Sequence, residues 1–160
     1  MFLKYLFNIL QIIITVIGGY YFIVALFSLA ISKGKQQNHA ENSFALIVAA
    51  HNEEAVVEDI VKSLKTLDYP AEKFEVFVVA DNCTDKTAEL AKNAGAQVLE
   101  RFDETKRGKG YAMEFAFDYI FALDKAYEYI CVFDADNVVK PDFLREMNSK
   151  INEGYRAVQG

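Results

Sequence analysis

Two long apolar runs, separated by a helical pattern, most constrain the fold of this chain. Residues 44–50 read Phe-Ala-Leu-Ile-Val-Ala-Ala, and residues 74–80 form a second, largely apolar run. Continuous runs of this kind are typical of strands buried on both faces of a sheet. Strands that are joined by helical crossovers lie parallel, with right-handed connections. The sequence therefore predicts an α/β domain built on a parallel sheet.

The remaining pattern predicts three more strands and four helices. We expect strands at residues 97–100, 129–133 and 156–159, and helices over residues 53–66, 85–93, 110–123 and 141–153. Asn52 is placed to cap the first helix, and Thr84 or Asp85 to cap the second. Pro141 suits the first turn of the last helix, where its missing N–H is not needed.

Ahead of this domain, residues 5–32 contain no charged side chain. A helix rises about 1.5 Å per residue and a bilayer core is about 30 Å thick, so about 20 residues span it. A cleaved signal peptide has a shorter apolar region, of about 7 to 15 residues. We therefore expect a transmembrane anchor at residues 1–33. Lys4 on one side and Lys33 and Lys35 on the other leave its orientation open.

Residues 34–43, rich in Gln, Asn and Lys, are expected to link this anchor to a domain at residues 44–160. With 52% hydrophobic and 14% aromatic residues the chain is not a disordered segment. A net charge of -6 argues against broad nucleic-acid binding, which needs a basic face. Cys83 and Cys131 form no CxxC pattern, so we expect reduced, cytosolic thiols instead of a disulfide or zinc site.

Polar residues follow three of the predicted strands, at residues 51–54, 81–85 and 134–137. In an open parallel sheet the carboxyl ends of the strands meet at one edge, where ligands bind. Residues 107–110, Arg-Gly-Lys-Gly, begin a predicted helix, where cations, free N–H groups and glycines suit a phosphate. The sequence thus predicts an anion site at this edge.

Each of these segments also has a purely structural interpretation. Asp134 and Asp136 can hold a divalent cation that also binds phosphate oxygens, or can merely cap the following loop. Asp81 can accept hydrogen bonds from a nucleobase or ribose, or can form an Asx turn. Asn52 and Glu53 fit helix capping, His51 fits a loop, and Arg107 with Lys109 fits a solvated charged loop. Only the four segments together favour the functional interpretation.

In this order the segments resemble the motifs of glycosyltransferase family 2, which has the GT-A fold. The matching residues are Ala49-Ala50-His51-Asn52-Glu53-Glu54, Asp81-Asn82-Cys83-Thr84-Asp85, Arg107-Gly108-Lys109-Gly110 and Asp134-Ala135-Asp136. The resemblance covers residues 44–160. It implies a Rossmann-like, mostly parallel sheet with flanking helices, preceded here by one transmembrane helix.

The resemblance also implies roles for individual residues. Ala50, Asn52 and Glu53 would line a uridine pocket, and Asp81 would bind the base. Lys109, helped by Arg107, would lie near the base and the diphosphate. Asp134 would contact the ribose or the metal shell, and Asp136 would bind Mg²⁺ or Mn²⁺. Such a metal stabilises the departing nucleoside diphosphate.

A member of this family transfers a sugar from a nucleotide-sugar donor, here expected to be a UDP-sugar, to a carbohydrate or lipid-linked acceptor. The resemblance favours an inverting, membrane-anchored enzyme whose single anchor leaves the domain in the cytoplasm. The general base and an Arg-Trp element are expected beyond Gly160, so we interpret the chain as the amino-terminal, donor-binding portion. An inverting transfer needs that base to take the proton of the acceptor hydroxyl.

Two other functions compete with this one. Asp134-Ala135-Asp136-Asn137-Val138 also fits the nucleophile motif of haloacid-dehalogenase-like phosphatases, whose later motifs would need more chain than follows Val138. The second competitor is a membrane-tethered remnant that binds a nucleotide-sugar without catalysis. A reading frame that continues past Gly160 with a base and an Arg-Trp element favours the transferase.

Overall fold

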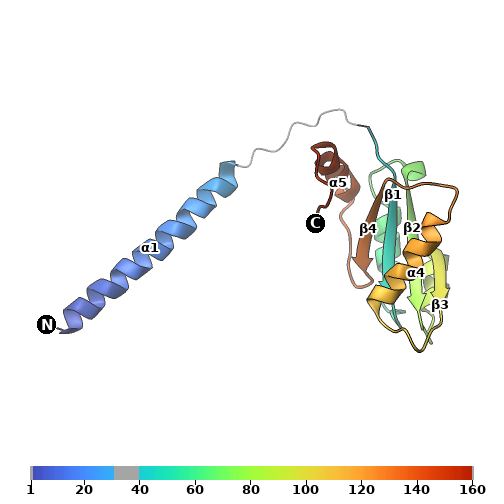
Figure 1. The fold of residues 1–160 in the computed structure, drawn as a ribbon, viewed down its shortest axis with the longest axis horizontal. Coiled ribbons are helices and arrows are strands. Elements are labelled where there is room, and N and C mark those ends of the chain that lie inside the picture. Colours follow the sequence, from blue (N-terminus) through green and yellow to red (C-terminus); the bar gives the residue numbers. More distant parts are fainter. Residues whose placement is uncertain (1, 31–39, 160) are drawn as a thin grey trace. The chain divides into compact units, whose positions relative to one another are not determined.

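The computed structural model of the chain describes residues 2–30 and 40–159, which belong to two compact units, residues 1–37 and 38–160 (Figure 1). The first unit contains helix α1 (Phe2–Ala30). Its segment Lys4–Val24 is long and apolar enough to cross a bilayer, a test that a signal sequence also passes. The helix expected within residues 1–33 is confirmed over its described part, whereas residues 31–33 and linker residues 34–39 lie outside the described residues.

The second unit is built on a parallel sheet with the strand order β3-β2-β1-β4. The strands are β1 (Phe44–Ala50), β2 (Phe74–Asp81), β3 (Gln97–Arg101) and β4 (Tyr129–Asp134). The register places Val48 beside Val78 on one side and beside Phe133 on the other. Four of the five expected strands are thus confirmed, and the parallel arrangement with them.

The expected strand at residues 156–159 is wrong. These residues are irregular, and residues 156–158 border an apolar groove beside β4 that Met147 and Ile151 also line. A strand exists only where a neighbour completes its hydrogen bonds, and among the described residues the outer edge of β4 has no such partner. A short apolar run by itself does not specify this pairing.

The connecting helices are α2 (Val57–Lys65), η1 (Ala71–Lys73), α3 (Thr87–Asn93), α4 (Lys109–Phe121) and α5 (Phe143–Asn152). The α-helices lie within the expected ranges, except that α4 begins one residue early, at Lys109. The short helix η1 was not expected. The expectation that Asn52 caps α2 is wrong. Asn52 has a positive φ of 56° and lies one turn ahead of the helix, whose N-cap is Val56. The backbone between them is a turn in which the Glu53 carbonyl accepts from Val56 and Val57.

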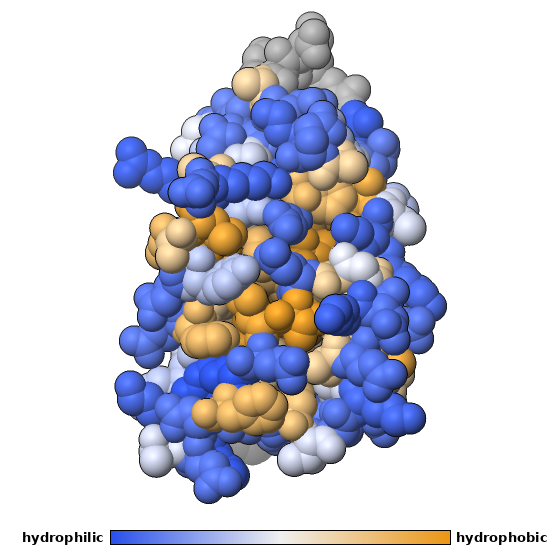
Figure 2. Space-filling view, turned by 90° about the vertical axis from the view of Figure 1, so that its right-hand side faces the viewer, coloured by the Kyte–Doolittle hydropathy of each residue, from blue (hydrophilic) through white to orange (hydrophobic). Residues whose placement is uncertain are grey.

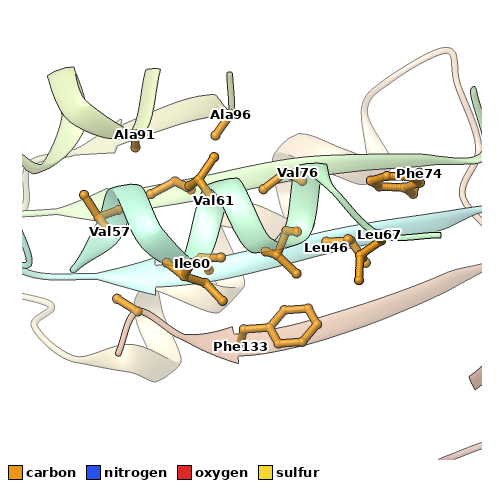
Figure 3. Close-up of a cluster of buried hydrophobic side chains, with 14 of the residues drawn as sticks. Leu46, Val57, Ile60, Val61, Leu67, Phe74, Val76, Ala91, Ala96 and Phe133 are labelled. Atoms are coloured by element: carbon orange, nitrogen blue, oxygen red, sulfur yellow. The ribbon is translucent and has the colours of Figure 1, made fainter. Parts of the chain in front are cut away.

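One face of the sheet is covered by α2, α3 and α5. Val57, Ile60, Val61 and Leu64 recur at helical spacing and are fully buried. Figure 3 shows Val57, Ile60 and Val61 lying against side chains of the sheet, among them Leu46, Val76 and Phe133. Burying each such side chain contributes about 1.5–3 kcal/mol. This layer therefore holds α2 directly behind the loop that follows β1.

The opposite face of the sheet packs against α4, which crosses in front of the strands in Figure 1. Its buried side chains Ala112, Ala116 and Ile120 face Ile47 and Phe77. The alanines four residues apart let the helix lie close to the strands. Because crossover helices run antiparallel to the strands, α4 begins at the edge where β1 and β2 end.

A buried asparagine fastens the residues that precede β1. Asn148 of α5 is only 8% exposed. Its Oδ1 accepts from the backbone N–H and the Nδ2 of Asn42, at 3.1 and 2.8 Å, and its Nδ2 donates to the Ala40 carbonyl at 3.2 Å. The point where the chain enters the second unit is therefore held by α5.

On the side of the molecule that Figure 2 shows, apolar residues lie in the middle of the face and hydrophilic residues surround them. The described surface carries several large exposed apolar side chains, among them Phe102, Phe121 and Val138. Single apolar side chains at the surface are ordinary for a folded domain. We therefore attach no function to them individually.

Candidate functional site

A pocket of about 320 Å³ lies at the carboxyl ends of β1 and β2, beside the start of α4. This volume is within the range of small-molecule sites, about 300–1,000 Å³. Its lining consists of Ala49, Ala50, His51, Glu53, Asp81, Asn82, Arg107, Gly108, Lys109 and Ala112. Five of the expected site residues line it, namely Ala50, Glu53, Asp81, Arg107 and Lys109. A pocket therefore lies at the sheet edge where the sequence predicted a ligand site.

The loops that follow β1 and β2 are tied together by hydrogen bonds. Asn52 Oδ1 accepts from the Thr84 backbone N–H at 2.8 Å, and the Glu54 N–H donates to Asp85 Oδ2 at 3.1 Å. The Glu53 N–H donates to Thr87 Oγ1 at 2.8 Å. Asn52 therefore holds the neighbouring loop and is not among the residues that line the pocket.

Thr87 is the buried centre of this link, because its hydroxyl also donates to Asp85 Oδ1 at 2.5 Å. Replacing Thr87 with the isosteric Val leaves the Glu53 N–H without its acceptor. We expect Thr87→Val to lower the free energy of unfolding by about 1–3 kcal/mol, because the half-buried Glu53 N–H and the half-buried Asp85 carboxylate each lose a partner. Urea unfolding of the full chain in detergent, followed by circular dichroism, measures it.

Thr66→Val is the matched control. The Thr66 hydroxyl is exposed and bonds carbonyls of its own helix at 3.1 Å, so water replaces those bonds. We expect a change within about 0.5 kcal/mol. Equal losses in the two variants would show that the Thr87 hydroxyl contributes nothing specific.

Asp81, which lines the pocket, belongs to a buried ion pair that the sequence did not predict. Arg101 Nη1 lies 2.6 Å from Asp81 Oδ1, and the two residues are only 8% and 6% exposed. The sheet register places Arg101 directly beside Asp81. The sequence did contain one signal for this pair: Arg101 is a charged residue at the end of a strand, and that strand neighbours the strand of Asp81.

Both hydrogen bonds that the described residues give to the Asp81 carboxylate go to one oxygen. Arg101 Nη1 and Asn82 Nδ2, the latter at 3.0 Å, donate to Oδ1. Among the described residues no fully buried side-chain oxygen lacks a partner, so Oδ2, to which none of them donates, is not fully buried in a residue that lines the pocket. The carboxylate thus offers one oxygen to a ligand while the other is held.

His51, expected to be an ordinary loop residue, also lines the pocket. Its Nδ1 lies 2.6 Å from the Asp81 carbonyl oxygen. Because a carbonyl only accepts, Nδ1 carries the proton in this contact. Nε2 is the ring nitrogen that can bond another partner. The signal for His51 was its position between the end of β1 and Asn52.

The loop that follows β3 is fastened to the same cluster. The Asp103 N–H donates to Asn82 Oδ1 at 2.8 Å, and Arg101 Nη2 donates to the Lys106 carbonyl at 2.7 Å. Asp103 Oδ1 accepts from Thr105 Oγ1 at 2.7 Å and from the Thr105 and Lys106 N–H groups. This loop carries Arg107 to the pocket.

The Thr105 hydroxyl, the N–H groups of Lys106 and Thr105, and the nearby Arg101 charge lower the pKa of Asp103 to about 2. A carboxyl whose folded pKa is depressed stabilises the fold above its unfolded pKa of about 3.9 and loses that contribution as pH falls. We expect Asp103→Asn to cost stability by an amount that is constant above about pH 4 and shrinks between pH 4 and 2. Thermal unfolding of both chains across this range tests it.

Gly108 and Lys109 form the start of α4. Gly108 is the N-cap with a φ of 112°, a backbone conformation that favours glycine. Lys109 forms an ion pair with Asp134, and both side chains are about half exposed. An exposed pair of this kind is worth at most about 1 kcal/mol, so a ligand can compete for either partner.

Asp134 and Asp136 stand at the end of β4 with Ala135 buried between them. Both aspartates are exposed and neither is among the residues lining the pocket. No cluster of three or more His, Cys, Asp or Glu side chains able to hold a metal occurs in the described ranges. Two carboxylates fit a cation such as Mg²⁺, which keeps waters and takes further oxygens from substrate phosphates.

Both cysteines are free thiols. Burial raises the pKa of Cys131 to about 11 and also raises the pKa of Cys83. Neither is therefore a thiolate near neutral pH. Cys83 instead contributes contacts inside the loop cluster, where its Sγ lies 3.6 Å from the Ala50 carbonyl oxygen.

Comparison with solved structures identifies the fold. S. aureus TarS 1-349 in complex with UDP-GlcNAc is 25% identical, with a TM-score of 0.59, over 69% of this chain and 31% of that one. The M. tuberculosis glucosyl-3-phosphoglycerate synthase in complex with Mn²⁺, UDP and phosphoglyceric acid is 21% identical, with a TM-score of 0.55, over 69% of this chain and 39% of that one. The likeness confirms the expected α/β fold of GT-A type.

Among curated proteins, the beta-monoglucosyldiacylglycerol synthase of Nostoc sp. (strain PCC 7120) is 41% identical over 105 residues, covering 62% of this chain and 21% of that protein. The poly-beta-1,6-N-acetyl-D-glucosamine synthase of Staphylococcus epidermidis is 28% identical over 132 residues, covering 79% of this chain and 30% of that protein. The chain thus spans about a fifth to a third of such relatives. Residues 45–160 match the model described as Glycosyl transferase family 2. The chain therefore belongs to glycosyl transferase family 2.

Proposed function

We propose that residues 44–160 form the donor-binding part of a glycosyltransferase whose donor is a UDP-sugar. The observation that carries the proposal is that Asp81 lines the pocket with only one carboxylate oxygen bonded by the described residues, while Arg107 and Lys109 line the same pocket. One part of the site is thus suited to a base and another to phosphates. Family membership and the UDP-GlcNAc complex of TarS support this donor class.

Asp81 selects the base through hydrogen-bond chemistry. An ionised carboxylate only accepts, so Oδ2 suits a base that presents an N–H at its pairing edge. Uracil does so at N3, whereas cytosine presents an acceptor there. Ala50 and Glu53 line the same pocket, and Asn52 supports their loop through Thr84.

Arg107 and Lys109 act on the diphosphate. Their positive charges, together with the first N–H groups of α4, attract phosphate oxygens. The Lys109–Asp134 ion pair is exposed, so phosphate binding can take Lys109 from Asp134. That exchange frees the Asp134 carboxylate for the ribose or for a metal shell.

Asp134 and Asp136 would hold Mg²⁺ or Mn²⁺. A bound cation of this kind neutralises the charge that develops on the departing nucleoside diphosphate. The Mn²⁺ and UDP complex of the M. tuberculosis synthase supports a metal. The two exposed carboxylates fit such an ion because they leave coordination positions for phosphate oxygens.

The acceptor is proposed to be a carbohydrate or a lipid-linked molecule. Relatives are named for a glucosylated diacylglycerol and for poly-beta-1,6-N-acetyl-D-glucosamine. Helix α1 is proposed as a single-pass membrane anchor that leaves the second unit on the cytoplasmic side, where nucleotide-sugars are available. The general base of an inverting transfer is expected beyond Gly160.

Calorimetric titration of UDP into the detergent-solubilised full chain tests the proposal. We expect binding with Mn²⁺ that weakens markedly when a chelator removes the metal. The reading frame past Gly160 then separates a transferase from a binder without turnover. A chain that is folded by circular dichroism and binds no UDP in either condition contradicts the donor site.

A further inference from the structure

The strongest unexplained feature near the pocket is the buried side chain of Arg101. It lies at the end of edge strand β3, is 8% exposed and does not line the pocket. A buried guanidinium is costly unless its charge and its donors are matched. Its partners therefore indicate what it does.

Arg101 joins three segments of the site. Nη1 donates to Asp81 Oδ1 at 2.6 Å, and Nη2 donates to the Lys106 carbonyl at 2.7 Å and approaches Asp103 Oδ2 at 3.3 Å. The guanidinium carbon lies 6.0 Å from the centre of the Tyr111 ring. A planar fork can make these separate bonds at once, whereas an ammonium is a single point charge.

Because two donors hold Oδ1, the Asp81 side chain cannot turn to offer either oxygen freely. Arg101 contributes the charged bond and Asn82 Nδ2 the second, at 3.0 Å. The remaining oxygen, Oδ2, then has a fixed place. We propose that Arg101 is a positioning residue that makes Asp81 a specific reader of the nucleobase, selecting a base that donates a hydrogen bond over one that accepts.

This inference rests on the proposed function, since it acts only if Asp81 contacts the base. It predicts an effect on base selection, which a merely structural arginine would not produce. UDP and CDP share their ribose and diphosphate and differ in the hydrogen-bonding pattern of the base, donor or acceptor at N3. Because the bases also differ at C4, which carries an amino group in cytosine, the change in the ratio of their affinities on replacing Asp81 or Arg101 reports on the contact at Asp81.

The experiment is calorimetric titration of UDP and of CDP, each with Mn²⁺, into the full chain in detergent. We expect wild type to prefer UDP by at least about tenfold, because one charge-assisted hydrogen bond is at stake. In Arg101→Met the preference should fall to within about twofold, with CDP affinity nearly unchanged. Arg101→Lys, which keeps a charge near Asp81, should lie in between.

Arg145→Met is the matched control, because Arg145 also forms an ion pair, with Asp68, but lies on α5 and is exposed. The preference of the Arg145→Met chain for UDP over CDP should equal that of wild type. The double variant Asp81→Ala with Arg101→Met should show no further loss of preference beyond Asp81→Ala, since Arg101 acts through Asp81. If Arg101→Met does not fold, Arg101→Lys decides the question.

The outcomes separate the two proposals. Wild type that prefers UDP, with Arg101→Met and Arg101→Lys keeping that preference, overturns the positioning role and leaves the donor site standing. Equal loss of UDP and CDP binding in the Arg101 variants shows a structural role alone and also overturns it. Wild type that binds neither nucleotide contradicts the proposed function, and the positioning role with it.

Discussion

We expect Asp81→Asn to abolish or reverse the base preference, so that the chain binds CDP at least as tightly as UDP. The donors Arg101 Nη1 and Asn82 Nδ2 both contact Oδ1 of the native carboxylate. They hold the amide oxygen of Asn at that place, because an amide nitrogen there would face two donors. The amide NH₂ then occupies the position of Oδ2 and meets the N3–H of uracil donor to donor. Cytosine presents an acceptor at the same atom and gains a hydrogen bond.

We expect UDP affinity to fall by about ten- to a hundredfold in this variant, from the loss of a charge-assisted bond. Calorimetry with both nucleotides measures it, after circular dichroism has shown that the variant is folded. That check is needed because Arg101 loses its charged partner, and breaking a buried pair costs about 3–5 kcal/mol. Asp118→Asn, an exposed carboxylate on α4, is the control and keeps the native preference. An unchanged UDP preference in Asp81→Asn refutes the assignment of Asp81 to the base.

Asp81→Ala separates the base from the phosphates in the same assay. It should weaken UDP binding while leaving the binding of inorganic pyrophosphate with Mn²⁺ intact. Equal loss for both ligands counts against a base contact.

We expect Asp136→Ala to remove the metal dependence of UDP binding. Asp136 is exposed at the end of β4 and has no charged partner among the described residues, so its carboxylate is available to a cation. We expect Mn²⁺ to raise UDP affinity by about tenfold or more in wild type and to have little effect in the variant. Titrations with Mn²⁺ and with chelator, and the Mn²⁺ electron paramagnetic resonance signal, measure this directly.

Asp142→Ala is the matched control, because Asp142 is an exposed carboxylate six residues further along the chain. The effect of Mn²⁺ on UDP affinity should be the same in Asp142→Ala as in wild type. Because the exposed Asp136 side chain forms no hydrogen bond or ion pair with the described residues, we expect Asp136→Ala to keep the native melting temperature. A variant that retains the full Mn²⁺ effect refutes the assignment of Asp136 as a metal ligand.

The strands and the ligand edge were predictable from the sequence because their signals are local. The apolar run of β1 needs burial on both faces, and the polar residues that follow each strand necessarily meet at one edge of a parallel sheet. Asp81, Arg107 and Lys109, which line the pocket, were placed at this edge in this way. The four segments in order, and not any one of them, indicated the family.

The errors arose where local pattern competes with tertiary contact. Asn52 has the chemistry of a helix cap, but its oxygen accepts from Thr84 of the next loop, across a contact that only the packed strands create. Residues 156–159 have the composition of a strand, yet in the described structure they do not pair with β4 through backbone hydrogen bonds. Capping and pairing both depend on what else comes within reach.

The parallel α/β fold, the apolar helix ahead of it and the polar edge that carries the pocket follow from the sequence alone, because periodicity and strand ends are properties of neighbouring residues. The pairing of Arg101 with Asp81 and the link that Thr87 makes between the two loops arise from tertiary packing. The ion pair depends on the register that places Arg101 beside Asp81 on neighbouring strands. A buried ion pair needs both charges to be desolvated together, and no linear spacing specifies that.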